Sequence, residues 1–72
     1  MPIYKCSYPF GNYTRDIDAI SFEYAASSFG KMFANAYHLS EGVTNAIISC
    51  NNEKRTYKIS FTTDYKTLIE QL

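Results

Sequence analysis

The chain has 72 residues, of which seven are basic and seven acidic, so its formal net charge is zero. This length suits one domain with a single small core, and it leaves little room for a deep substrate cleft. The balanced charge excludes a global electrostatic attraction to nucleic acid or membranes, and an apolar fraction of 46% excludes disorder. We therefore expect one folded domain over residues 1–72.

The first 20 residues predict a β-hairpin. Residues 4–8 alternate between inward and outward side chains, which is the pattern of a half-buried strand. Gly11-Asn12 suits a tight type II′ turn, and closing the hairpin there pairs Cys6 with Ile17. Pro9 cannot donate a ladder hydrogen bond, so we expect an irregular tip.

The middle of the chain predicts a long amphipathic helix. Ser21 is a suitable N-cap, and Glu23 lies in the first turn, where the helix dipole favours a negative charge. The apolar stripe of this helix is formed by Phe22, Ala26, Phe29, Phe33 and Ala36/Tyr37. Gly30 in mid-helix indicates a close approach to a sheet, and Gly42 is expected to provide a left-handed stop.

A second hairpin is predicted from the β-rich runs at residues 43–50 and 55–62. Its loop has either four residues, which pairs Ile48 with Tyr57, or only the two residues Asn51-Asn52. Both alternatives leave the same side chains on the inner face. After it, Thr63 or Asp64 could cap a short C-terminal helix, whose apolar residues would be Tyr65, Leu68, Ile69 and Leu72.

The order of elements is therefore ββαββα, an α+β fold. We expect a four-stranded antiparallel sheet in the order 2-1-3-4, with the long helix crossing in a right-handed sense over one face. The outer face would carry an apolar strip of Ile3, Val43 and Ile47. Such a strip either binds a partner or lies beneath the C-terminal residues.

Residues that could carry chemistry are few and scattered. The only histidine, His38, lies near the end of the helix, and Cys6 and Cys50 fall on inward strand faces, where thiols are usually inert. Asp16 and Asp18 share a strand face that we interpret as solvated. Neither a phosphate-binding glycine loop nor a metal-ligand spacing is present. We therefore expect no enzyme activity, no catalytic residues, no metal site and no cofactor.

The location of the protein is expected to be cytoplasmic. No stretch approaches the roughly 20 apolar residues that span a bilayer, and the first residues lack the basic and apolar segments of a signal peptide. The two cysteines are expected to remain reduced, with a disulfide between them as the less favoured alternative.

Tyrosines and basic residues supply the candidate contacts for a partner. Seven Tyr and five Phe either replace aliphatic residues in the core or form a recognition surface of rigid rings. Lys5 and Lys58 are predicted on one outer sheet face, where basic and aromatic side chains could bind single-stranded nucleic acid. The candidate partner-binding residues are Tyr13, Tyr24, Lys31, Lys54, Arg55, Lys58 and Tyr65.

The segment Ile17–Ala25 has the pattern Ile-x-Ala-x-Ser-x-Glu-x-Ala, which ends a hairpin and opens a helix. With Thr44–Ile48 and Lys58–Phe61, it resembles small anti-CRISPR proteins of the type I inhibitor kind, which come from phages and mobile elements. The resemblance spans residues 13–62. It implies a stoichiometric inhibitor that occupies a nucleic-acid-binding surface on a host defence complex. Basic residues on sheet or loop often make such contacts, and the candidates here are Lys31, Lys54, Arg55 and Lys58.

Our leading hypothesis is a phage or mobile-element binding protein that inhibits a host protein or ribonucleoprotein complex by occlusion. The alternative is a small nucleic-acid-binding module. A homodimer through a sheet edge or through the apolar strip is compatible with either hypothesis.

Overall fold

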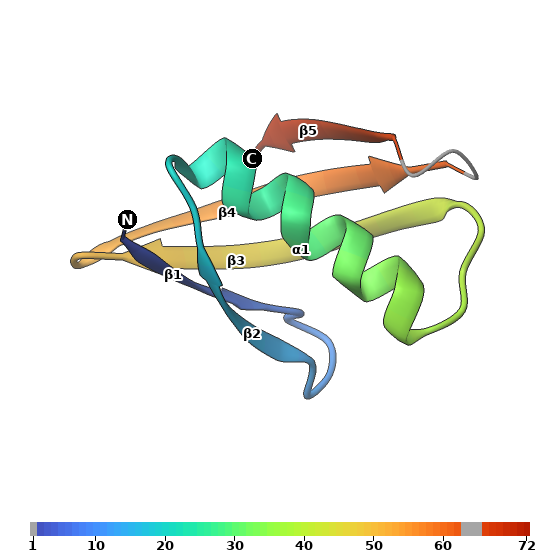
Figure 1. Cartoon of the computed structure of the whole chain (residues 1–72), viewed down its shortest axis with the longest axis horizontal. Helices are drawn as coiled ribbons and strands as arrows, with labels where there is room; N and C mark the ends of the chain where they lie inside the picture. Colours follow the sequence, from blue (N-terminus) through green and yellow to red (C-terminus); the bar gives the residue numbers. More distant parts are fainter. Residues whose placement is uncertain (1, 63–65) are drawn as a thin grey trace.

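A computed structural model describes residues 2–62 and 66–72, which form one helix packed on a five-stranded antiparallel sheet (Figure 1). The elements are β1 (Ile3–Ser7), β2 (Thr14–Asp18), α1 (Phe22–Ala36), β3 (Gly42–Cys50), β4 (Glu53–Phe61) and β5 (Thr67–Gln71). The strand order is β2-β1-β3-β4-β5. The α+β class and the predicted order of the first four strands are confirmed.

The prediction of four strands and a short C-terminal helix was wrong. Residues 67–71 instead form β5, which pairs with β4 so that Ile69 lies opposite Ile59. The apolar residues of this segment fit a helical spacing, but β4 offers an open row of backbone groups that a fifth strand satisfies. The predicted caps Thr63 and Asp64, and Tyr65, lie outside the described residues.

The first hairpin forms with a different register from the one predicted. Tyr4 lies opposite Ile17, and Cys6 lies opposite Arg15 rather than Ile17. The Tyr8 N–H donates to the Tyr13 carbonyl at 2.9 Å, so a four-residue loop replaces the predicted two-residue turn. Pro9 has no N–H and follows Tyr8 directly, which ends the ladder early. The shift of two residues leaves every side chain on its predicted face.

The second hairpin has the shorter of the two predicted loops. Asn51 and Asn52 have φ values of 50° and 69°, the positive values that a type I′ turn requires. β3 and β4 pair along their whole length around this turn, with Ala46 opposite Tyr57. The inward set of side chains is as predicted, because changing the loop by two residues keeps the period of two.

The helix begins as predicted and ends differently. At its start, the Tyr24 N–H donates to the Ser21 hydroxyl at 3.1 Å, which confirms Ser21 as the N-cap. At its end, His38 has a φ of 55° and the Leu39 N–H donates to the Ala34 carbonyl at 2.8 Å. These are features of a Schellman motif. The prediction that Gly42 stops the helix was wrong, because His38 already adopts the left-handed conformation and Gly42 begins β3.

Replacing His38 with glycine should raise the free energy of unfolding by about 0.5–1 kcal/mol. Glycine takes the left-handed conformation without a Cβ penalty, although it also gains freedom in the unfolded chain. Urea denaturation followed by circular dichroism measures the change. His38→Ala is the matched control and should destabilise, because alanine visits this region less readily than histidine. A His38→Gly variant less stable than His38→Ala would contradict the assignment.

The core lies between α1 and the inner face of the sheet. Phe29, Ile48, Tyr57 and Ile59 are at most 1% exposed. A Cβ atom on Gly30 would lie 2.5 Å from the Ile59 Cγ2, well inside van der Waals contact. The predicted close approach of the helix to the sheet is therefore confirmed.

The two halves of the sheet are joined over a short distance. Only Lys5–Ser7 of β1 pair with Ile47–Ser49 of β3, and beyond these pairs the β1–β2 hairpin diverges from β3 (Figure 1). There, the Tyr8 and Tyr13 rings lie 5.0 and 5.8 Å from the Phe33 ring centroid. Much of the aromatic content therefore serves packing between the hairpin and the helix.

Candidate binding surface

The sheet face turned away from α1, which we call the outer face, is not covered by any other element of the described chain. Its side chains alternate with the buried ones along each strand. They are Ile3, Lys5, Ser7, Thr14, Asp16, Asp18, Val43, Asn45, Ile47, Ser49, Lys54, Thr56, Lys58, Ser60, Leu68 and Glu70. Ile3 is 52%, Val43 59% and Leu68 76% exposed. Val43 and Leu68 lie in one row with Ser60 between them, but Ile3 lies at the other end of the sheet, because Lys5 pairs with Ser49, and Ile47 is half-buried. The predicted residues are therefore on the outer face, but they do not form a continuous strip.

Charges on the outer face compensate one another across the strands. Lys5 lies directly opposite Asp16, and Lys58 lies directly opposite Glu70. Side chains facing each other in this way are close enough to interact. A nucleic-acid groove depends on cations that remain available to phosphates. The outer face therefore has a mixed surface, on which Lys54 lies opposite Ser49 and Lys66 opposite Thr62, both without a carboxylate directly opposite.

The predicted contact residues do not form one site. Lys54 and Lys58 lie on the outer face, whereas Lys31 and Tyr24 are exposed on α1, on the other side of the sheet. Tyr13 is half-buried against the aromatic rings of α1. Tyr65 lies outside the described residues. The sequence pattern could not show that these residues lie on different sides of the molecule, because each occurs in a segment that alternates between buried and exposed positions.

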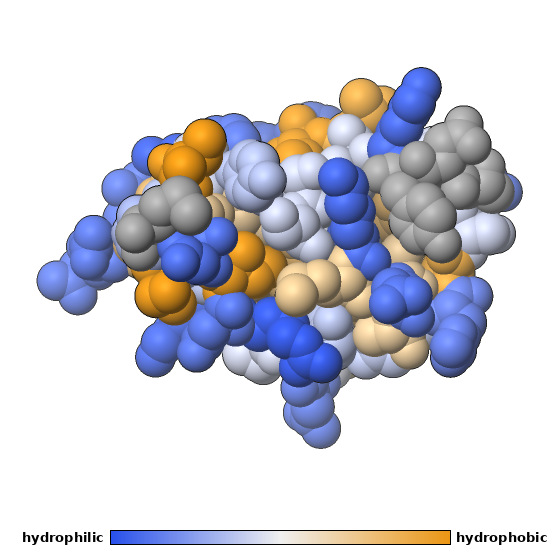
Figure 2. Space-filling model, in the orientation of Figure 1, coloured by the Kyte–Doolittle hydropathy of each residue, from blue (hydrophilic) through white to orange (hydrophobic). Residues whose placement is uncertain are grey.

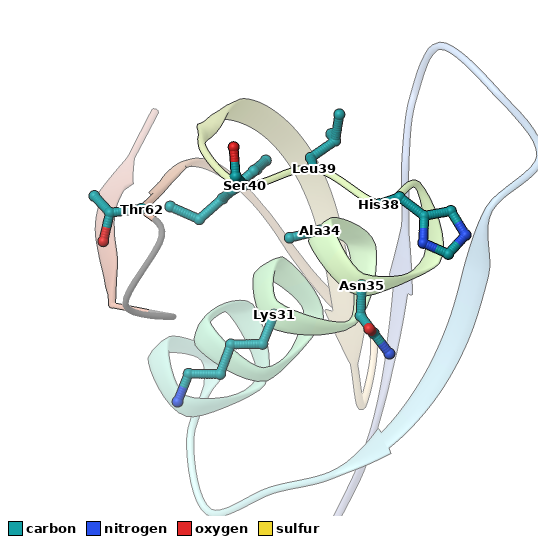
Figure 3. A pocket seen from close by; sticks show the side chains of 8 residues that line it. Lys31, Ala34, Asn35, His38, Leu39, Ser40 and Thr62 are labelled. Atoms are coloured by element: carbon teal, nitrogen blue, oxygen red, sulfur yellow. The ribbon is translucent and has the colours of Figure 1, made fainter.

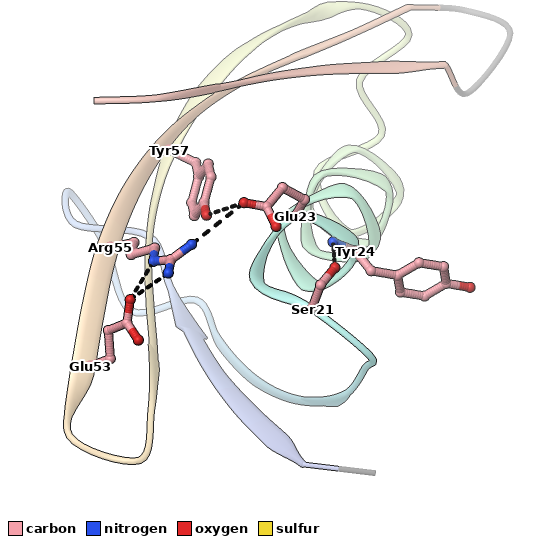
Figure 4. A network of polar contacts seen from close by, with 6 residues as sticks. All are labelled: Ser21, Glu23, Tyr24, Glu53, Arg55 and Tyr57. Atoms are coloured by element: carbon pink, nitrogen blue, oxygen red, sulfur yellow. Dashed lines mark hydrogen bonds and ion pairs between the residues drawn. The ribbon is translucent and has the colours of Figure 1, made fainter.

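Arg55 is engaged inside the molecule (Figure 4). Its guanidinium lies 2.6 Å from a Glu53 carboxylate oxygen and 3.6 Å from Glu23, and it covers the Phe22 ring at 4.3 Å. The Tyr57 hydroxyl donates to Glu23 at 3.0 Å, and burial is the main cause that raises the pKa of Tyr57. This network links the start of α1 to β4. Arg55 is on the inner face, so the geometry gives it a structural role.

The helix side of the molecule carries a smaller apolar feature. Figure 2 shows a mostly hydrophilic surface, with hydrophobic residues gathered toward the end where the N-terminus lies. At the start of α1, Ile20 and Tyr24 are 71% and 56% exposed. With Asp18 and Ala19 they line a shallow cavity of about 220 Å³. Tyr24 therefore has Ile20 as an apolar neighbour, but the surface that these two residues form is far smaller than the outer face.

A larger cavity of about 300 Å³ opens at the C-terminal end of α1 (Figure 3). Its lining consists of Lys31, Ala34, Asn35, His38, Leu39, Ser40, Phe61 and Thr62. Figure 3 shows the Lys31 and His38 side chains directed away from each other. Neither cysteine is among the lining residues, so the one histidine and a thiol are not brought together here. No pattern in the sequence predicts this cavity, because the end of α1 and Thr62 come together only in the folded chain.

Burial keeps the Cys6 thiol unreactive. Cys6 is 0% exposed, and burial, assisted by Asp16, raises its pKa to about 12. Cys50 lies on the same inner face and is partly exposed, and both cysteines are free thiols. The inward placement predicted for both residues is confirmed.

A thiol reagent at pH 8 should therefore modify Cys50 and leave Cys6 untouched. The thiolate is the reactive form, and a pKa of about 12 leaves on the order of 10⁻⁴ of the Cys6 thiol ionised at this pH. Titration with a chromogenic disulfide should release about one equivalent from the folded protein and two in denaturant. A Cys50→Ser variant should show no rapid reaction. Rapid modification of Cys6 in that variant would contradict its burial.

Residues 2–62 and 66–72 contain no group of three or more His, Cys, Asp or Glu side chains arranged to hold a metal ion. Their helix is neither long enough nor apolar enough to cross a membrane.

Comparisons with known proteins identify no relative of this chain. No protein-family model matches the chain, and neither a curated protein nor a solved structure matches it.

Proposed function

We propose that the chain is a non-enzymatic binding protein that contacts a protein partner through its outer face. The observation that carries the proposal is that this face is uncovered and bears exposed Ile3, Val43 and Leu68 among charged residues. Apolar residues surrounded by polar ones are typical of protein interfaces. The five strands have 5, 5, 9, 9 and 5 residues, 33 in total, which at about 3.3 Å per residue and about 4.8 Å between strands give roughly 500 Å². This is more than half of the roughly 800 Å² that each partner contributes to a standard interface.

The partner we favour is a host defence complex that the chain inhibits by stoichiometric occlusion. This narrower proposal draws support from the resemblance of Ile17–Ala25 and the two β3 and β4 segments to type I anti-CRISPR proteins. Inhibition by occlusion needs a binding surface and no catalytic residues. This suits a chain in which His38 and the buried Cys6 are not brought together as a nucleophile and base. The paired charges Lys5–Asp16 and Lys58–Glu70 favour a protein contact over a phosphate backbone.

The experiment is a titration of a reconstituted type I CRISPR effector ribonucleoprotein, with binding of fluorescent target DNA as the readout. We expect DNA binding to be lost at about one equivalent of the chain. Val43→Asp should weaken the inhibition by about 30-fold, the equivalent of a 2 kcal/mol contact. Met32→Asp places the same substitution on an exposed position of α1 and should inhibit normally.

Two results would overturn this assignment. DNA binding that persists in excess chain would exclude this effector as the target. A Val43→Asp variant that inhibits as well as Met32→Asp would exclude the outer face. Direct binding of the chain to single-stranded DNA or RNA, sensitive to salt and weakened by Lys54→Ala and Lys58→Ala, would favour the nucleic-acid module.

A further inference from the structure

The free edge of β5 has backbone groups whose direction can be assigned. The Thr62 N–H donates to the Lys66 carbonyl at 3.1 Å, and the Leu72 N–H donates to the Thr56 carbonyl at 2.8 Å. Alternate residues of an antiparallel strand bond to the same neighbour. Thr67, Ile69 and Gln71 therefore direct their N–H and C=O groups away from β4, and no strand of the described residues lies beyond them.

We propose that this edge pairs antiparallel with β5 of a second copy of the chain, around a two-fold axis at Ile69. Ile69 then lies opposite Ile69 of the partner copy, and Thr67 lies opposite Gln71. This register satisfies the N–H and C=O groups of all three outward residues in each copy. A shift by two residues would leave part of them unpaired. The two sheets join into one.

Side chains on the outer face fit the same register. Leu68 lies directly opposite Glu70 of the partner copy and diagonally across from Leu72 of the partner copy, and the two leucines are 76% and 63% exposed in the single chain. Lys66 lies diagonally across from Glu70 of the partner copy. Diagonal neighbours are within reach of long side chains. The leucines therefore meet on one diagonal and Lys66 and Glu70 on another, and neither contact changes the β4–β5 ladder.

The other edge of the sheet is protected against the same pairing. The Tyr8 N–H donates to the Tyr13 carbonyl and the Ala19 N–H donates to the Pro2 carbonyl. Odd-numbered residues of β2 therefore bond to β1, and Asp16, at the centre of β2, directs its N–H and C=O groups away from β1. A two-fold pairing of β2 would place Asp16 opposite Asp16 of the partner copy. Like charges directly opposite each other are destabilising, and charged residues are a common protection of edge strands. β5 has no such residue at its centre.

Sedimentation equilibrium over a dilution series tests the proposal with three proteins. The wild-type chain should sediment at twice its 8.3 kDa mass and dissociate on dilution. Gln71→Pro should be monomeric, because the ring removes an N–H that points away from β4 and leaves the β4–β5 ladder bonds in place. Gln71→Ala retains that N–H and should remain dimeric. Circular dichroism establishes that each variant is folded.

Amide hydrogen exchange of the wild-type chain provides a second readout that needs no substitution. The amides of Thr67, Ile69 and Gln71 should exchange about tenfold or more slowly at high concentration than after dilution. The outward amide of Asp16 on β2 should not change. A monomeric wild type, a folded Gln71→Pro dimer, or concentration-independent exchange at β5 would overturn the proposal. None of these results bears on the outer-face proposal, which Val43→Asp tests separately.

Discussion

Replacing Phe29 with alanine should lower the free energy of unfolding by about 3–5 kcal/mol. Phe29 is 0% exposed, and its ring lies 5.5 Å from the Tyr13 ring centroid and 6.4 Å from that of Phe33. A domain of this size has a total stability of roughly 4–11 kcal/mol. The loss is therefore comparable with the whole stability, and thermal unfolding followed by circular dichroism should show a much lower midpoint.

Met32→Ala is the matched control for this effect. Met32 lies on the same helix and is 42% exposed, so its truncation should change the stability by no more than about 0.5 kcal/mol. If Phe29→Ala behaved like Met32→Ala, the core could not lie between α1 and the sheet as described.

Gly30→Ala should also destabilise, although alanine usually stabilises a helix interior by about 1 kcal/mol relative to glycine. The new Cβ would lie 2.5 Å from the Ile59 Cγ2. Ile59 is β-branched and fully buried in β4, so its Cγ2 has little freedom to move away. We expect a net loss of about 1–3 kcal/mol, measured by urea denaturation.

A double-mutant cycle assigns the cause of this loss. Ile59→Ala removes the Cγ2 atom and is strongly destabilising by itself. In that background, Gly30→Ala should become neutral or stabilising, because the clash is gone and the helix propensity remains. An equal loss from Gly30→Ala in both backgrounds would mean that the close approach is not responsible.

Local patterns in the sequence were sufficient for most of the fold. The period of two in the strands assigned the inward faces, and Ser21 with the apolar stripe assigned α1. The register of the first hairpin was not predictable from pairing preferences, because it depends on Pro9 ending the ladder. β5 was not predictable because Leu68 and Ile69 fit either a helix or a strand. The open edge of β4 decides between them, and that edge is formed by residues elsewhere in the chain.

The candidate surface was partly predictable, because the alternation along each strand assigns side chains to a face but does not show which strands are neighbours. The apolar residues Ile3 and Val43 could be assigned to the outer face from alternation. The sequence could not show that Lys58 lies opposite Glu70, because the strand containing Glu70 was not predicted. Nor could the charge of Arg55 show that its partners are Glu53 and Glu23 rather than another molecule. Glu23 comes from the start of the helix and meets Arg55 only in the folded chain.

The ladder between β1 and β3 is confined to Lys5–Ser7 and Ile47–Ser49, which are distant in sequence, whereas β3 and β4 pair fully around a two-residue turn. Local contacts form early in folding, because they close short loops. We therefore expect the β3–β4 hairpin and α1 to form the folding nucleus, with φ-values well above those of the Tyr8 and Tyr13 positions. In the native state, the β1–β2 hairpin should be the first unit to open. Opening it would expose the aromatic rings that join it to α1.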